Sequence, residues 1–206
     1  MFDFTESPLT LFILLINVLV SGYALFMDHG LVDRLSFKPQ RILHDREYYR
    51  LFSAGFVHVG LGHLAFNMIT LYFFGPLLEQ ILGPVKFLLL YFGSELAAHG
   101  LSLLLHKQST SYAAVGASGA ISGVVFAYCL FFPFQKIYLY FMIGIPAILF
   151  AVGYVGFSIY AMKQKHEGMT GGIAHEAHLG GALGGLLLTI LLEPRSLQIF
   201  LGQLGF

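Results

Sequence analysis

Ser118 stands where a polar segment of the chain turns into an apolar one, and its hydroxyl group could act as a nucleophile. It lies between glycines in the sequence Gly116-Ala117-Ser118-Gly119, after the polar residues 107–112 and before an apolar run that ends at Phe132. A serine hydroxyl is a weak nucleophile until a neighbouring base accepts its proton. The same tetrapeptide would also suit a contact between membrane helices, where small residues are common. Taken alone, it leaves both interpretations open.

His178 is the candidate for that base, since a neutral imidazole accepts protons near neutral pH. His178, Gly181 and Gly185 are spaced i, i+3 and i+7, so they share one face of a helix. Two further glycines follow Ser118 at i+1 and i+5. Glycines at such spacings let two membrane helices approach backbone to backbone. Packing the two glycine faces together would therefore bring His178 towards Ser118.

The residues around this pair predict a serine–histidine dyad. No aspartate occurs in any predicted membrane helix, and Glu176, two residues before His178, faces nearly away from it. Attack on an amide also requires donors for the developing oxyanion. His63 and Asn67, spaced i, i+4 on one helix face, can supply two of them. The backbone N–H of Ser118, at the positive end of a helix dipole, can supply another.

The elements that carry these residues are predicted to be membrane helices. Of the 206 residues, 57% are hydrophobic and 11% charged, and the mean hydropathy is +0.77. Such a composition indicates a polytopic membrane protein in contact with the lipid bilayer. Formal net charge is zero, which gives no indication of nucleic-acid binding. We expect one all-α domain over residues 1–206, with six helices at about 9–27, 57–82, 84–105, 118–132, 137–162 and 173–192.

The fourth predicted helix is too short to cross a bilayer. Residues 118–132 reach only about 22 Å as a helix, whereas a bilayer core is roughly 30 Å thick. One end must therefore stop inside the membrane, where backbone groups need a protein-lined or watery recess. The second, fourth and sixth helices cross in the same direction, so their amino-terminal ends lie on one side. Their polar residues then lie at one depth, which indicates a functional site.

The first apolar stretch is predicted to be a retained membrane helix. It is long enough to span, and the residues before it include Asp3 and Glu6 but no basic residue, unlike a secretory signal. We expect a multi-pass protein of a cell membrane. A cytoplasmic amino terminus would leave only Lys86, Lys136 and Arg195 on the inside, against the positive-inside rule. Most other basic residues lie in the long, charge-balanced first loop, where the rule carries less weight.

Other polar residues in the predicted helices have a simpler structural interpretation. Glu95 and His99, spaced i, i+4, are expected to form a polar pair within the third helix. Glu79 is expected to tie the second helix to a loop. The tail, residues 195–206, is apolar enough to lie at the membrane interface.

Three motifs, taken together, resemble the rhomboid family of intramembrane serine proteases. They are His58-x4-His63-Leu64-Ala65-Phe66-Asn67-Met68, Gly116-Ala117-Ser118-Gly119 and Ala177-His178-x2-Gly181-x3-Gly185. They occur in the order of the family and on the expected helices, and the resemblance covers essentially the entire chain. It implies a six-helix rhomboid-like bundle with a short central fourth helix.

The resemblance also implies an activity and its residues. Ser118 would be the nucleophile and His178 the general base of a serine endopeptidase. His63, Asn67 and the Ser118 backbone N–H would stabilise the oxyanion. Substrates would be transmembrane helices of membrane proteins, with small residues and weak helical propensity near the cleavage site. No cofactor and no metal ion are implied.

Further features of the family carry over with two departures. His58 would be a supporting hydrogen-bonding residue, Gly116 would shape the loop before the nucleophile, and the amino terminus would be cytoplasmic. Many members carry a Trp-Arg pair in the first loop, where this chain has Tyr49-Arg50. Many members also place an aromatic residue four positions after the serine, stacked on the catalytic histidine, and here that residue is Ser122.

Two other functions remain open at this point. An inactive relative would bind or retain membrane proteins without cleaving them. A metal transporter would use histidines, namely His58, His63, His175 and His178. No acidic ligand shares a face with these histidines, which weakens the metal interpretation. The chain contains no HExxH motif and no aspartate in a predicted span, which excludes other classes of intramembrane protease.

Access to the site is predicted to depend on two segments. The polar residues 163–172 would form a mobile lid over the site. The fifth helix, with glycines and with Pro146 near its middle, would flex at a lateral opening.

Overall fold

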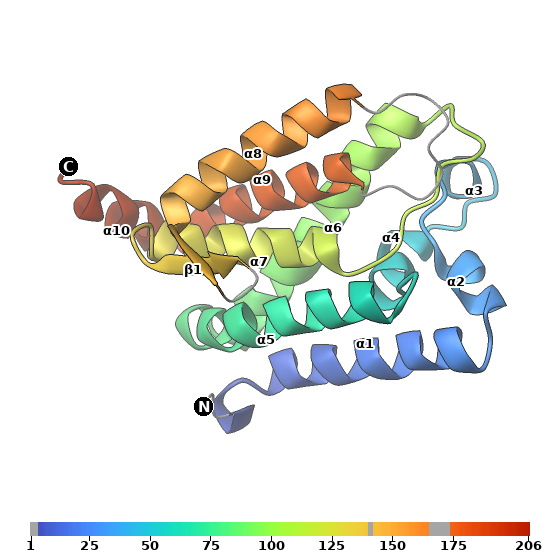
Figure 1. Ribbon diagram of the computed structural model, residues 1–206, viewed down its shortest axis with the longest axis horizontal. Helices are drawn as coiled ribbons and strands as arrows, with labels where there is room; N and C mark the ends of the chain where they lie inside the picture. Colours follow the sequence, from blue (N-terminus) through green and yellow to red (C-terminus); the bar gives the residue numbers. More distant parts are fainter. Residues whose placement is uncertain (1–3, 140–141, 165–173) are drawn as a thin grey trace.

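The computed structural model describes residues 4–139, 142–164 and 174–206. Within them the chain forms a bundle of helices with one small hairpin (Figure 1). The elements are η1 Phe4–Glu6, α1 Pro8–Phe26, α2 Gly30–Leu35, α3 Pro39–Leu43, α4 Arg50–Ser53, η2 Ala54–Phe56, α5 Leu61–Leu82, α6 Pro84–His106, α7 Ser118–Phe131, β1 Lys136–Leu139, β2 Ile143–Pro146, α8 Ala147–Gln164, α9 His175–Leu192 and α10 Arg195–Gln203.

The long helices are apolar enough to cross a membrane. Among the described residues, α1, α5, α6 and α9 have both the length and the composition of a span, while α7 and α8 are apolar but shorter. The protein is thus a multi-pass integral membrane protein with an all-α bundle, as predicted. Because α7 has only 14 residues, it extends about 21 Å along its axis. Its ends cannot both reach the membrane surfaces.

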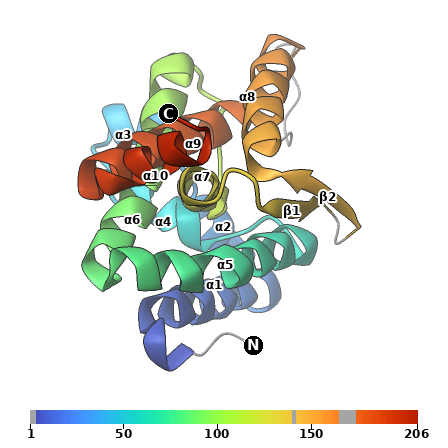
Figure 2. The same cartoon turned by 90° about the vertical axis from the view of Figure 1, so that its left-hand side faces the viewer.

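Helix α7 lies in the middle of the bundle, with α5, α6, α8 and α9 around it (Figure 2). Every residue of α7 is buried except Ser118 and Tyr128. Its sequence is apolar or small on all sides, which is typical of a helix enclosed by protein. The predicted central position of this short helix is confirmed, and its amino-terminal residue is Ser118.

Glycines allow α7 and α9 to touch through their backbones. A Cβ atom added to Gly181 would lie 2.1 Å from the carbonyl oxygen of Gly119. A Cβ atom added to Gly185 would lie 2.2 Å from the Cα atom of Gly123. Both distances are far below a normal van der Waals contact, so a side chain at either position would force the helices apart. The predicted packing of these glycine faces is confirmed.

The buried carboxylate of Glu79 joins α5 to the beginning of α1. It accepts hydrogen bonds from the backbone N–H groups of Leu9 (3.0 Å) and Thr10 (2.7 Å), and from the Thr10 hydroxyl (2.7 Å). These are unpaired donors of the first helical turn, and a carboxylate there also interacts favourably with the helix dipole. The expected partner, a loop, is wrong; Glu79 caps a membrane helix instead.

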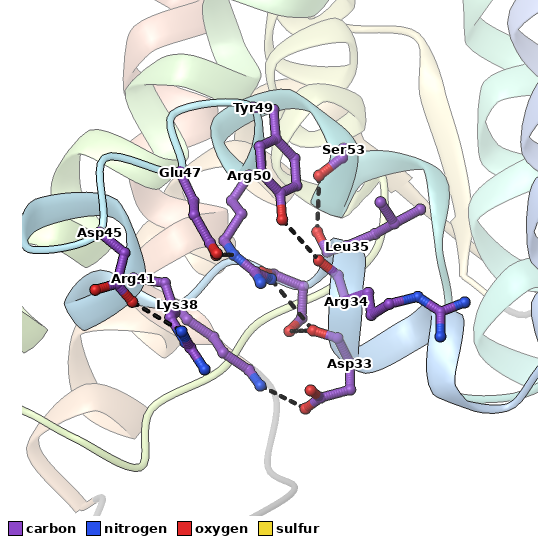
Figure 3. Close-up of polar contacts among 11 residues, drawn as sticks. Asp33, Arg34, Leu35, Lys38, Arg41, Asp45, Glu47, Tyr49, Arg50 and Ser53 are labelled. Carbon is purple, nitrogen blue, oxygen red and sulfur yellow. Dashed lines mark hydrogen bonds and ion pairs between the residues drawn. The ribbon is translucent and has the colours of Figure 1, made fainter.

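Arg50 organises the segment between α1 and α5 (Figure 3). Its buried guanidinium donates to the Glu47 carboxylate at 2.5 Å and to the carbonyl oxygens of Ser36 (2.8 Å) and Asp33 (3.2 Å). At the rim of the same cluster, the hydrogen bond from Lys38 lowers the pKa of the Asp33 carboxyl. Arg50 therefore holds two backbone carbonyl groups of the first loop together, and the residue before it is Tyr49 and not tryptophan.

The same loop supports the segment that leads into α7. Phe37 and Ala114 form an antiparallel bridge, with N–H···O distances of 2.9 and 3.1 Å. The Gly116 N–H donates to the Ala54 carbonyl oxygen at 2.9 Å. These backbone bonds attach the approach to Ser118 to the first loop.

Two helix starts differ by several residues from the sequence-based prediction. The helix expected over 137–162 is wrong at its beginning, because residues 136–139 and 143–146 form the antiparallel hairpin β1–β2, with Lys136 opposite Pro146. The β-branched and aromatic residues there favour strands, and α8 begins only after Pro146. Pro146 therefore precedes the helix and cannot bend its middle. The second helix begins at Leu61 and not at residue 57, after an extended Gly60.

The sixth helix is described from His175 onward. Residue 173, where this helix was expected to begin, lies outside the described residues, as do positions 165–172 of the expected lid. The tail forms α10, whose buried side is small. Lys86 and Arg195 both pair with Glu193 at the start of this helix, at 2.8 and 2.6 Å.

We expect Gly185→Ala to destabilise the bundle, because the added methyl group would overlap Gly123. Overpacking of this kind costs about 1–3 kcal/mol, and a lower melting temperature in detergent would report it. The matched control is Gly153→Ala in α8, where an added Cβ meets nothing within 4 Å. That change should be neutral or stabilising, because alanine favours helix more than glycine does. Equal effects of the two variants would contradict the close contact.

We expect the Glu193 ion pairs to contribute less to stability in acid. Hydrogen bonds from Arg195 and then Lys86 lower the pKa of Glu193 from 4.5 to about 2. A group whose pKa is lowered by folding contributes stability above its unfolded pKa, and this is lost as the pH falls. Glu193→Gln should therefore lower the melting temperature near about pH 7 and have a smaller effect near about pH 3. An equal effect at both pH values would argue against these pairs as stabilising contacts.

Candidate active site

The hydroxyl of Ser118 and the imidazole of His178 lie within hydrogen-bonding distance. Ser118 Oγ is 2.7 Å from His178 Nε2. Ser118 begins α7 and His178 lies in the first turn of α9, so residues 60 positions apart in the chain meet at one end of the bundle. Both side chains are partly exposed. A hydroxyl that donates to a neutral imidazole has the geometry needed for activation by a general base.

The backbone before Ser118 requires a glycine. Gly116 has φ +107°, in the region that residues with side chains avoid. A Cβ atom there would also lie 2.5 Å from the Cε1 atom of His63. The ring of His63 therefore packs directly on the backbone of this loop. This close approach explains why the sequence has glycine at position 116.

The two candidate oxyanion donors lie on α5 beside this loop. The His63 Nδ1 atom is buried and has no hydrogen-bond partner among the described residues. Asn67 is also buried, and its side-chain amide donates to the His63 carbonyl oxygen at 2.9 Å. Buried polar groups are rarely left unpaired in proteins, so the Nδ1 atom of His63 calls for an explanation.

His58 supports the loop from the other side. Its Nε2 atom accepts the Ala117 N–H at 3.4 Å, and its Nδ1 atom lies 2.8 Å from Ser21 Oγ. Because Nε2 is the acceptor, the proton of a neutral ring is on Nδ1 and is donated to Ser21. The Ser21 hydroxyl in turn donates to the Phe56 carbonyl oxygen at 2.9 Å. Helix α1 is thereby linked to the residue that precedes Ser118.

Glu176 does not contact His178 through its carboxylate. It accepts a hydrogen bond from the Tyr112 hydroxyl at 2.7 Å, and its Oε1 atom lies 3.0 Å from His106 Nε2. Burial, and then the nearby Glu176 charge, raise the pKa of the Tyr112 hydroxyl well above its usual value. These contacts attach α9 to the loop that precedes Ser118. They agree with the prediction that Glu176 faces away from the base.

Glu95 has a role that its spacing did not reveal. Its Oε2 atom accepts the Ala120 N–H at 3.0 Å, in the first turn of α7, and its Oε1 atom lies 3.6 Å from His99 Nε2. The expected pair with His99 is therefore present, but the carboxylate also caps the helix that begins with Ser118. A cavity of about 20 Å³ lies between Glu95 and Ser118, which is enough for one water molecule.

Two aromatic rings lie near the imidazole of His178. The rings of His175 and His178 are 6.4 Å apart at an interplanar angle of 80°. The ring of Tyr154, from α8, lies 6.5 Å from that of His178 at 22°. Tyr154 was not singled out from the sequence, because nothing in its local pattern indicates a contact with α9.

The histidines proposed as metal ligands come from two separate places. The rings of His58 and His63 are 5.0 Å apart and lie beside the loop before Ser118, whereas His175 and His178 begin α9. Across residues 4–139, 142–164 and 174–206, no group of three or more His, Cys, Asp or Glu side chains could hold a metal ion.

Comparison with known proteins identifies the family. A sequence model of the rhomboid domain matches residues 45–195. The mitochondrial RHOMBOID-like protein 12 of Arabidopsis thaliana is 28% identical over 171 residues, which make up 76% of this chain and 48% of that protein. The putative rhomboid protease YdcA of Bacillus subtilis is 31% identical over 145 residues, 70% of this chain and 67% of YdcA. The rhomboid protease GluP of the same bacterium is 28% identical over 149 residues, 72% of this chain and 27% of GluP.

The chain thus spans about half of the first relative, two thirds of the second and about a quarter of the third. The rhomboid match includes α5 to α9 and therefore every residue of the Ser118 and His178 site. With most of its length matched in this way, the chain belongs to the rhomboid family.

Proposed function

We propose that this protein is an intramembrane serine endopeptidase that cleaves transmembrane segments of other membrane proteins. The observation that carries the proposal is the 2.7 Å contact between Ser118 Oγ and His178 Nε2 at the start of a buried, short helix. Membership of the rhomboid family and relatives named as rhomboid proteases support it. The partners would be membrane proteins that enter the site from the lipid bilayer.

In the first half of the reaction, Ser118 Oγ attacks the carbonyl carbon of a substrate peptide bond. His178 Nε2 accepts the hydroxyl proton as the new C–O bond forms. The carbonyl oxygen becomes an oxyanion, which the Ser118 backbone N–H and the side chains of His63 and Asn67 stabilise. His178 then donates its proton to the amide nitrogen, the C–N bond breaks, and an ester to Ser118 remains.

In the second half, water replaces the departed amine. His178 removes a proton from the water as its oxygen attacks the ester, and returns the proton to Ser118 Oγ when the ester bond breaks. The partial exposure of both side chains leaves room for this water. Only the two side chains, the donors and water take part, so the atoms and protons balance without a cofactor.

The hydrogen bonds around His63, Asn67 and the Ser118 N–H support their assignment as oxyanion donors. Among the described residues the buried Nδ1 atom of His63 has no partner, so this half-buried ring keeps unused hydrogen-bonding capacity near Ser118. The Asn67 amide donates only to its own helix, at the carbonyl of His63, and can exchange this bond for one to a substrate oxygen. Glu95 and His58 hold the adjacent N–H groups of Ala120 and Ala117, so the Ser118 N–H is presented by a supported backbone.

We expect Ser118→Ala and His178→Ala each to reduce cleavage of a model transmembrane substrate by roughly 10⁴-fold or more. The effect is large because the loss of either member alone disables the catalytic unit. Ser118→Ala should also remove labelling by a serine-reactive fluorophosphonate. The control is Ser111→Ala, an exposed serine of the preceding loop. Melting temperatures would verify folding. An unlabelled, inactive wild-type protein would favour the alternative, a rhomboid-like binding protein without protease activity.

We expect Asn67→Ala to lower kcat about 100- to 1,000-fold, as loss of one oxyanion donor does in other serine proteases. KM should change little, because the donor acts mainly in the transition state. The matched control is Thr70→Ala, three residues further along α5. Thr70 is half-buried, and its hydroxyl donates to the Phe66 carbonyl oxygen of its own helix. A change confined to KM would assign Asn67 to substrate binding or packing.

A further inference from the structure

We propose that Tyr154 of α8 is a positioning residue that holds the His178 imidazole in its reactive orientation, with Ser122 as the anchor of its hydroxyl. The inference rests on the proposed Ser118–His178 dyad and adds a third helix to it. It concerns how the base is oriented, which the dyad contact alone does not explain.

The first observation is the contact between the two rings. The ring planes of Tyr154 and His178 are inclined by 22°, and their centroids lie 6.5 Å apart. This is an offset, nearly parallel arrangement within the range of aromatic contacts. The imidazole is thus bordered by a flat surface while its Nε2 atom lies 2.7 Å from Ser118 Oγ.

The second observation is the anchor of the phenol. The Tyr154 hydroxyl lies 2.8 Å from the hydroxyl of Ser122. Ser122 is nearly buried and lies one turn after Ser118, on the same face of α7. Tyr154 therefore binds the helix that carries the nucleophile while its ring borders the base on α9. This hydrogen bond fixes the phenol oxygen, so a χ1 rotation that swung the Tyr154 ring away from α7 and His178 would break it.

The third observation is the packing of Tyr154 itself. Phe126 of α7 contacts it edge-on, with ring centroids 5.4 Å apart at 62°. Phe150, one turn earlier on α8, lies 5.7 Å away. With two aromatic neighbours and one hydrogen bond, the Tyr154 side chain has little freedom to change rotamer. A fixed ring of this kind can restrict the torsion angles of the imidazole beside it.

Such a residue is needed because, among the described residues, no carboxylate is hydrogen-bonded to His178. In a serine protease triad, a carboxylate bonded to the histidine sets its orientation. Here the Glu176 carboxylate is engaged by Tyr112 and His106. A displacement of about 1 Å in a reacting group can cost about 100-fold in rate. Ring packing from α8 supplies an orientation that a carboxylate would otherwise provide.

The test compares variants that remove the ring with variants that remove only the hydrogen bond. We expect Tyr154→Leu to lower kcat by up to about 100-fold with little change in KM. Tyr154→Phe and Ser122→Ala should each lower kcat by roughly 5- to 10-fold, as expected for loss of one hydrogen bond. Because both remove the same bond, the double variant Ser122→Ala/Tyr154→Phe should be no slower than either single variant. Tyr160→Leu, an exposed tyrosine of the same helix, is the control.

A second readout separates positioning from substrate entry. The rate at which a small fluorophosphonate labels Ser118 depends on activation of the hydroxyl and not on docking of a transmembrane segment. The labelling rate should fall in the same order as kcat, and Tyr154→Leu should be labelled most slowly. Tyr154→Phe should be labelled faster than Tyr154→Leu, because it keeps the aromatic ring. Melting temperatures would show whether each variant is folded. If Tyr154→Leu does not fold, the two hydrogen-bond variants and their double variant still decide the question.

The outcomes distinguish this inference from the proposed function. A wild-type protein that is not labelled at Ser118 would overturn the dyad, and the role of Tyr154 with it. Labelled wild-type protein with unchanged labelling and kcat in Tyr154→Phe, Ser122→Ala and Tyr154→Leu would overturn the role of Tyr154 alone. If the reductions in kcat of the two single variants added up in the double variant, the hydrogen bond between Ser122 and Tyr154 would not be what orients the ring.

Discussion

The backbone contact between α7 and α9 is the constraint on which the rest of this structure depends. With Gly119 and Gly123 facing Gly181 and Gly185, the two helices approach more closely than any side chain would allow. This separation sets the distance between the first turn of α9 and the start of α7. The contact of Ser118 with His178 is a consequence of that distance. Within a membrane no hydrophobic force drives helices together, so they associate through close packing at small residues. Here the close packing of four glycines brings a serine and a histidine into contact.

The second constraint is the burial of a helix end. Helix α7 begins inside the bundle, so its first N–H groups need partners other than bulk water. His58 accepts the N–H of Ala117 and Glu95 accepts that of Ala120. Both side chains come from other helices or loops, and both are buried. The residues that satisfy the backbone are therefore the same ones that hold Ser118 in place. Stability and geometry of the site depend on one set of hydrogen bonds.

The match to the rhomboid family covers Ser118, His178 and the residues that pack around them. The rhomboid match covers residues 45–195, and the serine, the histidine and the glycines come with it. Ser122 and Tyr154 lie within the same range, and their hydroxyl groups are 2.8 Å apart. The hairpin β1–β2 lies within the same range and directly precedes α8. With identities of 28% to 31%, these relatives establish the family, while the contacts of His178 come from the structure of this chain itself.

The sequence by itself determined the elements whose signals are local and periodic. The apolar runs predicted the long helices, the length of residues 118–132 predicted a short buried one, and the spacing of Gly181 and Gly185 predicted their contact with α7. Only the tertiary structure decided the partners of Glu79, Glu95 and Tyr154, because each contact joins helices whose relative rotation no local pattern records. It also decided the hairpin of residues 136–139 and 143–146, where an apolar run is compatible with either helix or strand until its neighbours are known. A short apolar run specifies burial, and packing specifies which face, which partner and which backbone conformation is buried.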